Sequence, residues 1–155
     1  MRILVAVDGS ECSDYLVENI VNRPWAEDDS FKVIMVALAQ AGMMISGVSI
    51  GTVDLPEEIE QAKVIAKRNA QKLKDALDNS VEYEVLTGFA AETICSYAES
   101  EGFDLILMGS HGRTGIVRFV MGSVAEAVLK KSPCSVEVIK HPGLEDEDDD
   151  HDDDD

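Results

Sequence analysis

Cysteine is scarce in this chain of 155 residues, and its three cysteines follow no pairing motif. Cys12, Cys95 and Cys134 are an odd number, and no CxxC pair occurs. This usage argues against a disulfide framework and predicts a reducing, cytoplasmic compartment. Cys95 shares a helix face with Ile94 and Ala98, which predicts a core position. Cys12 falls in an expected first helical turn, where a thiolate would be stabilised.

Long apolar runs are missing as well. A membrane-spanning helix needs about 20 apolar residues, and no stretch of the chain approaches that length. Met1 and Arg2 lead straight into a strand-like run and an acidic turn, without the regions of a signal peptide. The length is typical of one domain. We therefore expect a single domain and no membrane partner.

Basic residues are few, because 13 Lys and Arg face 31 Asp and Glu, for a net charge of −18. Residues 145–155 hold ten of the acidic side chains and no base, so the rest of the chain has a net charge of −8. Self-repulsion predicts a disordered acidic tail, which we assign to residues 142–155. This tail either solvates the chain or docks on a basic partner. A negative body argues against nucleic acid as a partner.

No catalytic or metal-binding constellation can be assembled from the three histidines. His111 has no Ser-His-Asp or Cys-His partners at a recognisable spacing, and no zinc-ligand spacing exists. A kinase or ATPase would also need a metal-holding carboxylate, a phosphate lysine and a water-positioning group, and none stands out. The sequence therefore favours binding without a catalytic residue. The alternative is a slow ATPase or phosphotransferase that uses His111 and the arginines near it.

Strand-like and helix-like segments alternate along the chain. Apolar runs predict strands at residues 2–7, 31–38, 81–86, 105–108 and 135–139. Three- and four-residue periodicity predicts helices that stop before Pro24 and that cover residues 56–77, 91–101 and 123–131. Residues 39–55 lack a clear period and predict a mobile excursion near a binding site. The order predicts an α/β fold, a doubly wound, open five-stranded parallel sheet with helices on both faces.

The most informative motif is Gly109-Ser110-His111-Gly112, followed by nine residues and Gly122-Ser123. It lies between a strand-like run and a helix-like run, where glycines allow close approach and the helix N-terminus favours an anion. The motif is not a Walker loop, since there is no Lys between Gly109 and Ser123. It is not the dinucleotide fingerprint either, since no GxGxxG follows the first strand. Ser123 is placed to cap the helix or to offer its hydroxyl to a phosphate. The motif predicts a phosphate-binding loop.

This motif resembles the universal stress protein family, whose nucleotide-binding members carry G-x-x-G, nine residues and G-S/T. Residues 5–10 (VAVDGS) resemble the opening strand and turn of that family, and residues 132–138 (SPCSVEV) resemble its last strand. Residues 87–94 resemble its third-strand exit, with Ala90 where proline is common. The resemblance covers residues 1–141 and implies an adenine nucleotide alpha-hydrolase-like domain there. It also implies a homodimer through the last strand, from Val136 to Ile139.

The resemblance implies an adenine nucleotide ligand, ATP or else AMP or ADP, with Mg²⁺ carried by the phosphates. Asp8 only accepts hydrogen bonds and so suits the N–H or O–H groups of a nucleoside. It could also be a turn residue that caps the first helix, and both roles are compatible because a carboxylate has two oxygens. Backbone groups at Leu38 would contact the adenine. Those at Gly112 and at Gly122-Ser123 would hold the phosphates. The expected binding residues are Ala6, Val7, Asp8, Leu38, Met108, Gly109, Gly112, Arg113, Gly122, Ser123 and Val124.

The implied role is that of a nucleotide-responsive regulatory or stress-resistance protein. Besides the enzyme, one further alternative stays open, an interaction protein that needs no nucleotide and acts through its acidic tail.

Overall fold

The computed structural model describes residues 1–38, 44–45, 48–49, 55–112 and 121–144. The strands are β1 (Arg2–Ala6), β2 (Ser30–Ala37), β3 (Met44–Ile45), β4 (Val48–Ser49), β5 (Ser80–Thr87), β6 (Leu105–Gly109) and β7 (Ser135–Ile139). The helices are α1 (Glu11–Val21), α2 (Leu55–Ala76), α3 (Ala90–Glu101) and α4 (Ser123–Lys131), with a short 3₁₀ helix, η1 (Pro142–Leu144). The described structure therefore continues three residues beyond the domain boundary predicted at 141. Residues 145–155, where most of the predicted tail falls, lie outside it.

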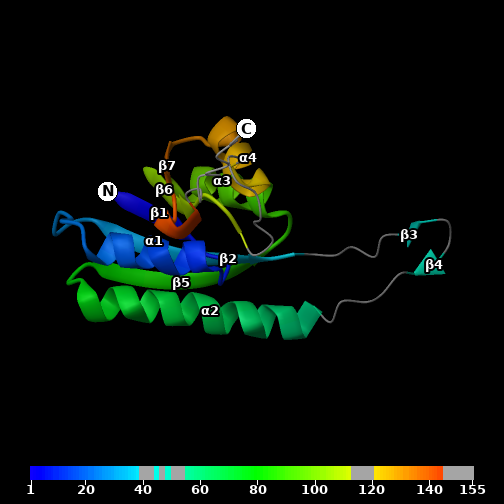
Figure 1. Ribbon diagram of the computed structural model, residues 1–155, viewed down its shortest axis with the longest axis horizontal. Coiled ribbons are helices and arrows are strands. Elements are labelled where there is room, and N and C mark those ends of the chain that lie inside the picture. Colours follow the sequence, from blue (N-terminus) through cyan, green and yellow to red (C-terminus); the bar gives the residue numbers. More distant parts are fainter. Residues whose placement is uncertain (39–43, 46–47, 50–54, 113–120, 145–155) are drawn as a thin grey trace, which may run out of the picture.

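Five strands form one parallel sheet in the order β5-β2-β1-β6-β7 (Figure 1). The predicted five-stranded parallel sheet is confirmed, with β5 and β7 at its edges. Successive strands are added outward from β1 to β2 and β5, and the chain then returns to the other side of β1 to form β6 and β7. The strand order thus reverses between β1 and β6. In open α/β sheets, ligands bind at the carboxyl ends of the strands beside such a reversal.

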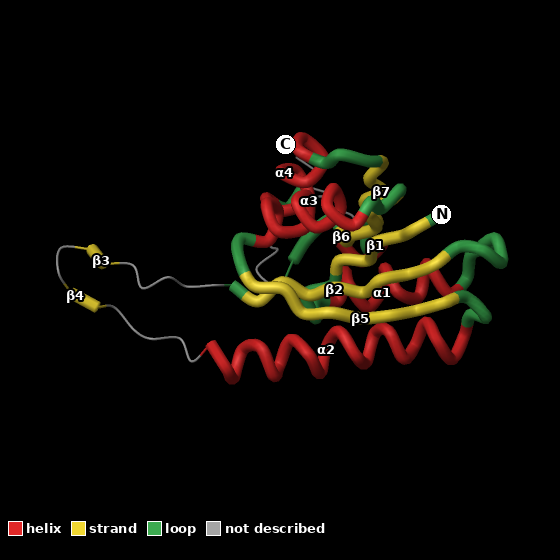
Figure 2. Tube along the Cα trace, turned by 180° about the vertical axis from the view of Figure 1, so that it is seen from behind, coloured by secondary structure: helices red, strands yellow, loops and turns green. Residues whose placement is uncertain are grey.

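The helices cover both faces of the sheet (Figure 2). Helices α1 and α2 pack on the face that carries Ile3 and Val5, and α3 and α4 pack on the face that carries Leu4. All three of these β1 side chains are fully buried. Because successive side chains of a strand point to opposite faces, a strand covered on both faces must be apolar at every position. This explains the unbroken apolar run that predicted β1.

Residues 39–55 contain structure that the sequence did not indicate. Strands β3 and β4 pair antiparallel, with Met44 opposite Ser49 and Ile45 opposite Val48. The prediction of a mobile excursion for residues 39–55 named no strand, so the strand assignment of these four residues adds to it. Two residues per strand are too few to produce an alternation that could be recognised. Among the described residues, no helix is both long and apolar enough to cross a membrane.

One buried polar residue of α2 is under-satisfied. Asn69 is 0% exposed, and its side-chain N–H donates to the Ile65 carbonyl at 3.0 Å. Its Oδ1 has no hydrogen-bond partner within the part of the chain that the structure describes. A buried acceptor without a partner destabilises the folded state by about 1–3 kcal/mol.

We therefore expect Asn69→Ala to stabilise the fold, although it removes a hydrogen bond. Alanine removes the unsatisfied oxygen and improves helix propensity by about 0.6 kcal/mol, and both effects oppose the small cavity it leaves. Urea denaturation should give a free energy of unfolding about 1 kcal/mol higher than that of the wild type. A marked decrease would mean that Oδ1 has a partner in solution.

Candidate functional site

A cavity of about 320 Å³ opens at the carboxyl ends of β1 and β6, beside the reversal of strand order. Its walls come from the ends of three central strands, the glycine loop after β6 and the first residues of α3 and α4. The described lining residues are Ala6, Val7, Asp8, Ser13, Ile34, Val36, Ala90, Ile94, Met108, Gly109, Ser110, His111, Gly112, Met121, Gly122, Ser123, Val124 and Ala125.

Nine of the eleven predicted binding residues line this cavity: Ala6, Val7, Asp8, Met108, Gly109, Gly112, Gly122, Ser123 and Val124. Leu38 does not line it; this side chain follows β2 and is 45% exposed. Arg113 lies outside the described residues. The fold therefore brings together residues from two segments of the chain about 100 positions apart.

Three glycines of the motif lie where an added side chain would come too close to neighbouring atoms of the protein. A Cβ atom at Gly112 would lie 2.7 Å from Asp8 Oδ2, and one at Gly122 would lie 2.9 Å from the Ser110 carbonyl oxygen. At Gly109 it would lie 3.0 Å from the Cβ atom of Cys12. The close neighbour is therefore a backbone atom at Gly122 and a side-chain atom at Gly109 and Gly112, and the missing glycine side chains allow each approach.

The N-terminus of α4 differs in two ways from the prediction. Gly122 is the N-cap, and Ser123 is the first helical residue, so the prediction that Ser123 caps the helix is wrong. The Gly122 N–H donates to the Ser110 carbonyl at 2.7 Å, which occupies the group that we expected to hold a phosphate. Gly122 therefore shapes the loop. Within the described part of the chain, the first helical residues, beginning with Ser123 and Val124, present N–H groups that have no intrahelical partner.

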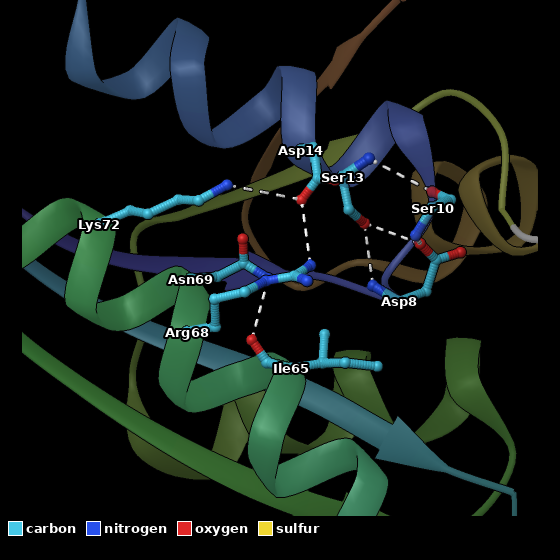
Figure 3. A network of polar contacts seen from close by, with 8 residues as sticks. All are labelled: Asp8, Ser10, Ser13, Asp14, Ile65, Arg68, Asn69 and Lys72. Carbon is cyan, nitrogen blue, oxygen red and sulfur yellow. Dashed lines mark hydrogen bonds and ion pairs between the residues drawn. The ribbon is translucent and has the colours of Figure 1, made fainter.

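Asp8 is hydrogen-bonded to residues at the start of α1 (Figure 3). Its Oδ1 accepts hydrogen bonds from the Ser10 backbone N–H at 2.9 Å and from the Ser13 hydroxyl at 2.7 Å. The N-cap of α1 is Ser10, whose hydroxyl accepts from the Ser13 N–H at 3.3 Å, so the alternative that Asp8 caps this helix is wrong. Asp8 instead belongs to the turn before the cap, with its carboxylate at the cavity wall.

The floor of the cavity is apolar, and its charged groups are few. Ile34, Val36 and Ile94 contribute branched side chains, whereas Asp8 is the one carboxylate among the described lining residues. Ser110 is 3% exposed, and its hydroxyl lies 2.9 Å from His111 Nδ1. The described residues contain no group of three potential metal ligands.

Several lining residues were not predicted. Ser13 and Ser110 lie within or next to the quoted motifs, and Val36 lies two positions before Leu38, near the end of β2. The alternation of β2 could have indicated Val36, because residues two apart share a face. The contribution of Ala90 and Ile94 from α3 depends on how that helix packs over the sheet, and no local pattern encodes it.

Cys12 contradicts the predicted stabilised thiolate. Its side chain is 4% exposed under the glycine loop, and burial raises the pKa of its thiol. A hydrogen bond from the His111 backbone opposes this effect but does not reverse it. Desolvation therefore has a larger effect on the pKa of the Cys12 thiol than its position near the N-terminus of α1. The predicted core position of Cys95 is confirmed, since it is buried with Ile94 and Ala98.

The three cysteines should react with a thiol reagent in the order of their exposure. We expect half-buried Cys134 to react first with an Ellman-type reagent at about pH 7.5, while Cys12 and Cys95 stay protected in folded protein. Because burial raises the pKa of the Cys12 thiol above its usual 9.0, its labelling should remain slow until the pH exceeds that value. Mass spectrometry of the labelled peptides measures the order. Fast labelling of Cys12 at neutral pH would contradict the burial seen here.

Comparison with known proteins agrees with the fold and the motifs. The family model of the universal stress protein family matches residues 1–140. Universal stress protein MJ0531 of Methanocaldococcus jannaschii is 29% identical over 145 residues, which cover 93% of this chain and 84% of that protein. The solved structure of MJ0577 from the same organism is 28% identical, with a TM-score of 0.75 over 90% of this chain and 95% of that one.

Two other solved universal stress proteins are complexes with an adenine nucleotide. One is in complex with cAMP, and the other, from Archaeoglobus fulgidus, is in complex with dAMP. Each is 19% identical to this chain and covers 90% of it, with TM-scores of 0.65 and 0.61 over 96% and 98% of the respective neighbour. At this identity the likeness shows the fold alone. The family match over nearly the whole described chain shows that the protein belongs to the universal stress protein family.

Proposed function

We propose that this chain is a nucleotide-responsive regulatory or stress-resistance protein that binds an adenine nucleotide, ATP or else AMP or ADP, in the cavity beside β1 and β6. The observation that carries the proposal is the set of glycines whose missing side chains leave room at the cavity wall and at the N-terminus of α4. The cAMP and dAMP complexes of two structural neighbours support an adenine nucleotide as the ligand class.

The parts of the cavity match the parts of such a ligand. The apolar floor of Ile34, Val36 and Ile94 suits the face of a base, and the N–H groups at the start of α4 suit a phosphate. Asp8, an acceptor, suits nucleoside O–H or N–H groups between them. We propose that Mg²⁺ enters on the phosphates, since the described lining offers one carboxylate.

Titration calorimetry with ATP and Mg²⁺ tests the proposal directly. We expect one site per chain with micromolar to millimolar affinity, competed by AMP. Well-folded protein that releases no heat with millimolar ATP, and that does not bind a fluorescent ATP analogue, would end the proposal.

The alternative of an ATP-dependent enzyme has one supporting contact, the 2.9 Å approach of Ser110 Oγ to His111 Nδ1. Hydrolysis far above the level of a mock purification, lost in His111→Ala with unchanged folding, would favour the enzyme. Absent or very slow hydrolysis beside clear binding favours the regulatory protein.

We also propose a homodimer through the outer edge of β7, from Val136 to Ile139. Among the described residues this edge has no strand partner, and Val136 and Val138 are only half-buried. Pairing with a second copy would satisfy its unpaired backbone groups. Glu137 forms an ion pair with Arg23 at 2.9 Å, which neutralises the one acidic side chain of the strand.

Charge should govern this association. Each chain has a net charge of −18, and ten of its acids lie in residues 145–155, after β7. Salt screens repulsion over about 8 Å at physiological ionic strength. We therefore expect dimerisation to strengthen with salt and with removal of residues 145–155. Analytical ultracentrifugation of both forms measures this, and monomers of both at high salt and tens of micromolar protein would contradict it.

A further inference from the structure

We propose that Ser13 is a positioning residue of the nucleotide site, which fixes the Asp8 carboxylate in the orientation that accepts a hydrogen bond from the nucleoside. This inference rests on the function proposed above and adds a residue that no motif of the loop contains. Ser13 lies in the first turn of α1, is 3% exposed and lines the cavity beside Asp8.

The Ser13 hydroxyl contacts Asp8 in two directions (Figure 3). It accepts a hydrogen bond from the Asp8 backbone N–H at 2.9 Å and donates its own proton to Asp8 Oδ1 at 2.7 Å. A serine hydroxyl has one proton, so its donor capacity is used entirely on Asp8. The pair forms a closed ring between the exit of β1 and the start of α1.

This ring fixes the orientation of the Asp8 carboxylate. Oδ1 accepts from the Ser13 hydroxyl and from the Ser10 N–H, so turning the carboxylate out of this orientation would break both hydrogen bonds. Oδ2 lies 2.7 Å from the place where a Cβ atom of Gly112 would stand, which puts it against the loop expected to hold the phosphates. A preorganised acceptor loses less freedom on binding than a mobile one. Ser13 would supply that preorganisation.

A purely structural role for Ser13 is the competing explanation. The Ser13 backbone N–H also donates to the Ser10 hydroxyl, and this contact closes the first turn of α1. That contact belongs to the backbone and survives any side-chain substitution at position 13. Replacing the side chain therefore isolates the hydroxyl that contacts Asp8 from the capping of the helix.

Two substitutions and two probes separate these roles. Ser13→Ala removes the hydroxyl, and Ser13→Cys keeps a side chain of similar shape with a weak donor. The probes are AMP, which has a nucleoside, and inorganic tripolyphosphate, which has none. We expect both variants to bind AMP about tenfold more weakly than the wild type, with tripolyphosphate affinity unchanged within about twofold.

Ser132→Ala is the matched control. Like the Ser13 hydroxyl, the Ser132 hydroxyl donates one hydrogen bond and accepts another: it donates to the Cys134 carbonyl at 2.9 Å and accepts from the Cys134 N–H at 3.2 Å. It lies at the other end of α4, outside the cavity lining. Its loss should leave AMP affinity within about twofold of the wild type.

The combination with Asp8→Ala tests whether Ser13 acts through Asp8. In the Asp8→Ala background the Ser13 hydroxyl has no side-chain acceptor to orient at position 8, so Ser13→Ala should weaken AMP binding by less than about twofold further. A full tenfold further loss would mean that Ser13 contacts the ligand itself, and this would overturn the inference. Equal AMP affinity in wild type and Ser13→Ala would overturn it as well.

The wild-type measurement separates failure of this inference from failure of the proposed function. Wild-type protein that binds neither AMP nor ATP would overturn both. Wild-type binding with the Ser13 variants unaffected would overturn only the role of Ser13. If neither Ser13 variant has a cooperative thermal transition, Ser13 is a structural residue and the inference is wrong.

Discussion

Replacing Gly122 with valine is expected to weaken ATP binding by at least about 100-fold. A Cβ atom at this position would lie 2.9 Å from the Ser110 carbonyl oxygen and 3.3 Å from the His111 Cα atom. Both are backbone atoms that cannot move aside as a flexible side chain would. The Gly122 N–H also donates to the same carbonyl at 2.7 Å, so a shift that relieves the contact breaks this hydrogen bond.

The substitution should also affect the end of the cavity where we propose that the phosphates bind, because Gly122 is the N-cap of α4. Displacing Gly122 would move the first N–H groups of the helix away from that position. Calorimetry with ATP and Mg²⁺ measures the loss, with folding checked by circular dichroism. Gly143→Ala is the control, since its Cβ atom would meet only the His141 ring, outside the cavity. Gly122→Val with wild-type affinity would show that the ligand binds elsewhere.

Replacing Leu4 with alanine is expected to lower the free energy of unfolding by about 3 kcal/mol. Leu4 is 0% exposed at the centre of β1, the middle strand of the sheet. It packs in the cluster with Ile34 and Ile106 under α3 and α4, where three layers of structure limit collapse of the resulting cavity.

Denaturant unfolding measures this loss, and Val64→Ala is the matched control. Val64 lies on α2 and is 67% exposed, so its truncation should change stability by less than about 0.5 kcal/mol. A Leu4→Ala variant that loses under about 1 kcal/mol would mean that the two helices close the cavity.

The main strands and helices could be predicted because each leaves a local signal. The all-apolar run of β1 indicated a strand buried on both faces, and Gly102, at φ +66°, ends α3 where the sequence predicted a stop. The short pairing of β3 with β4 left no such signal, because two residues per strand define no period.

The site was predictable to the extent that its residues belong to the motif. Gly112 and Gly122 were identified by spacing, yet the use of the Gly122 N–H inside the loop depends on how residues 110 and 122 meet in space. Likewise, the prediction of a stabilised thiolate at Cys12 was based only on its position near the N-terminus of a helix. The glycine loop that covers this side chain, and so raises the pKa of its thiol, comes from the other end of the chain.

The position of β1 between β2 and β6 also determines the order in which its two edges can pair while the chain is being synthesised. Ile3 pairs with Phe31 on one side and with Leu105 on the other, so the second partner follows the first by 74 residues of chain (105 minus 31). At translation rates of about 5–20 residues per second, that interval lasts roughly 4–15 s. During it, an apolar strand has one open edge, the kind of surface that chaperones and aggregation compete for. Asp8 and Gly112 meet only after β6 has closed that edge, so the cavity cannot form on the nascent chain before β6 has joined the sheet.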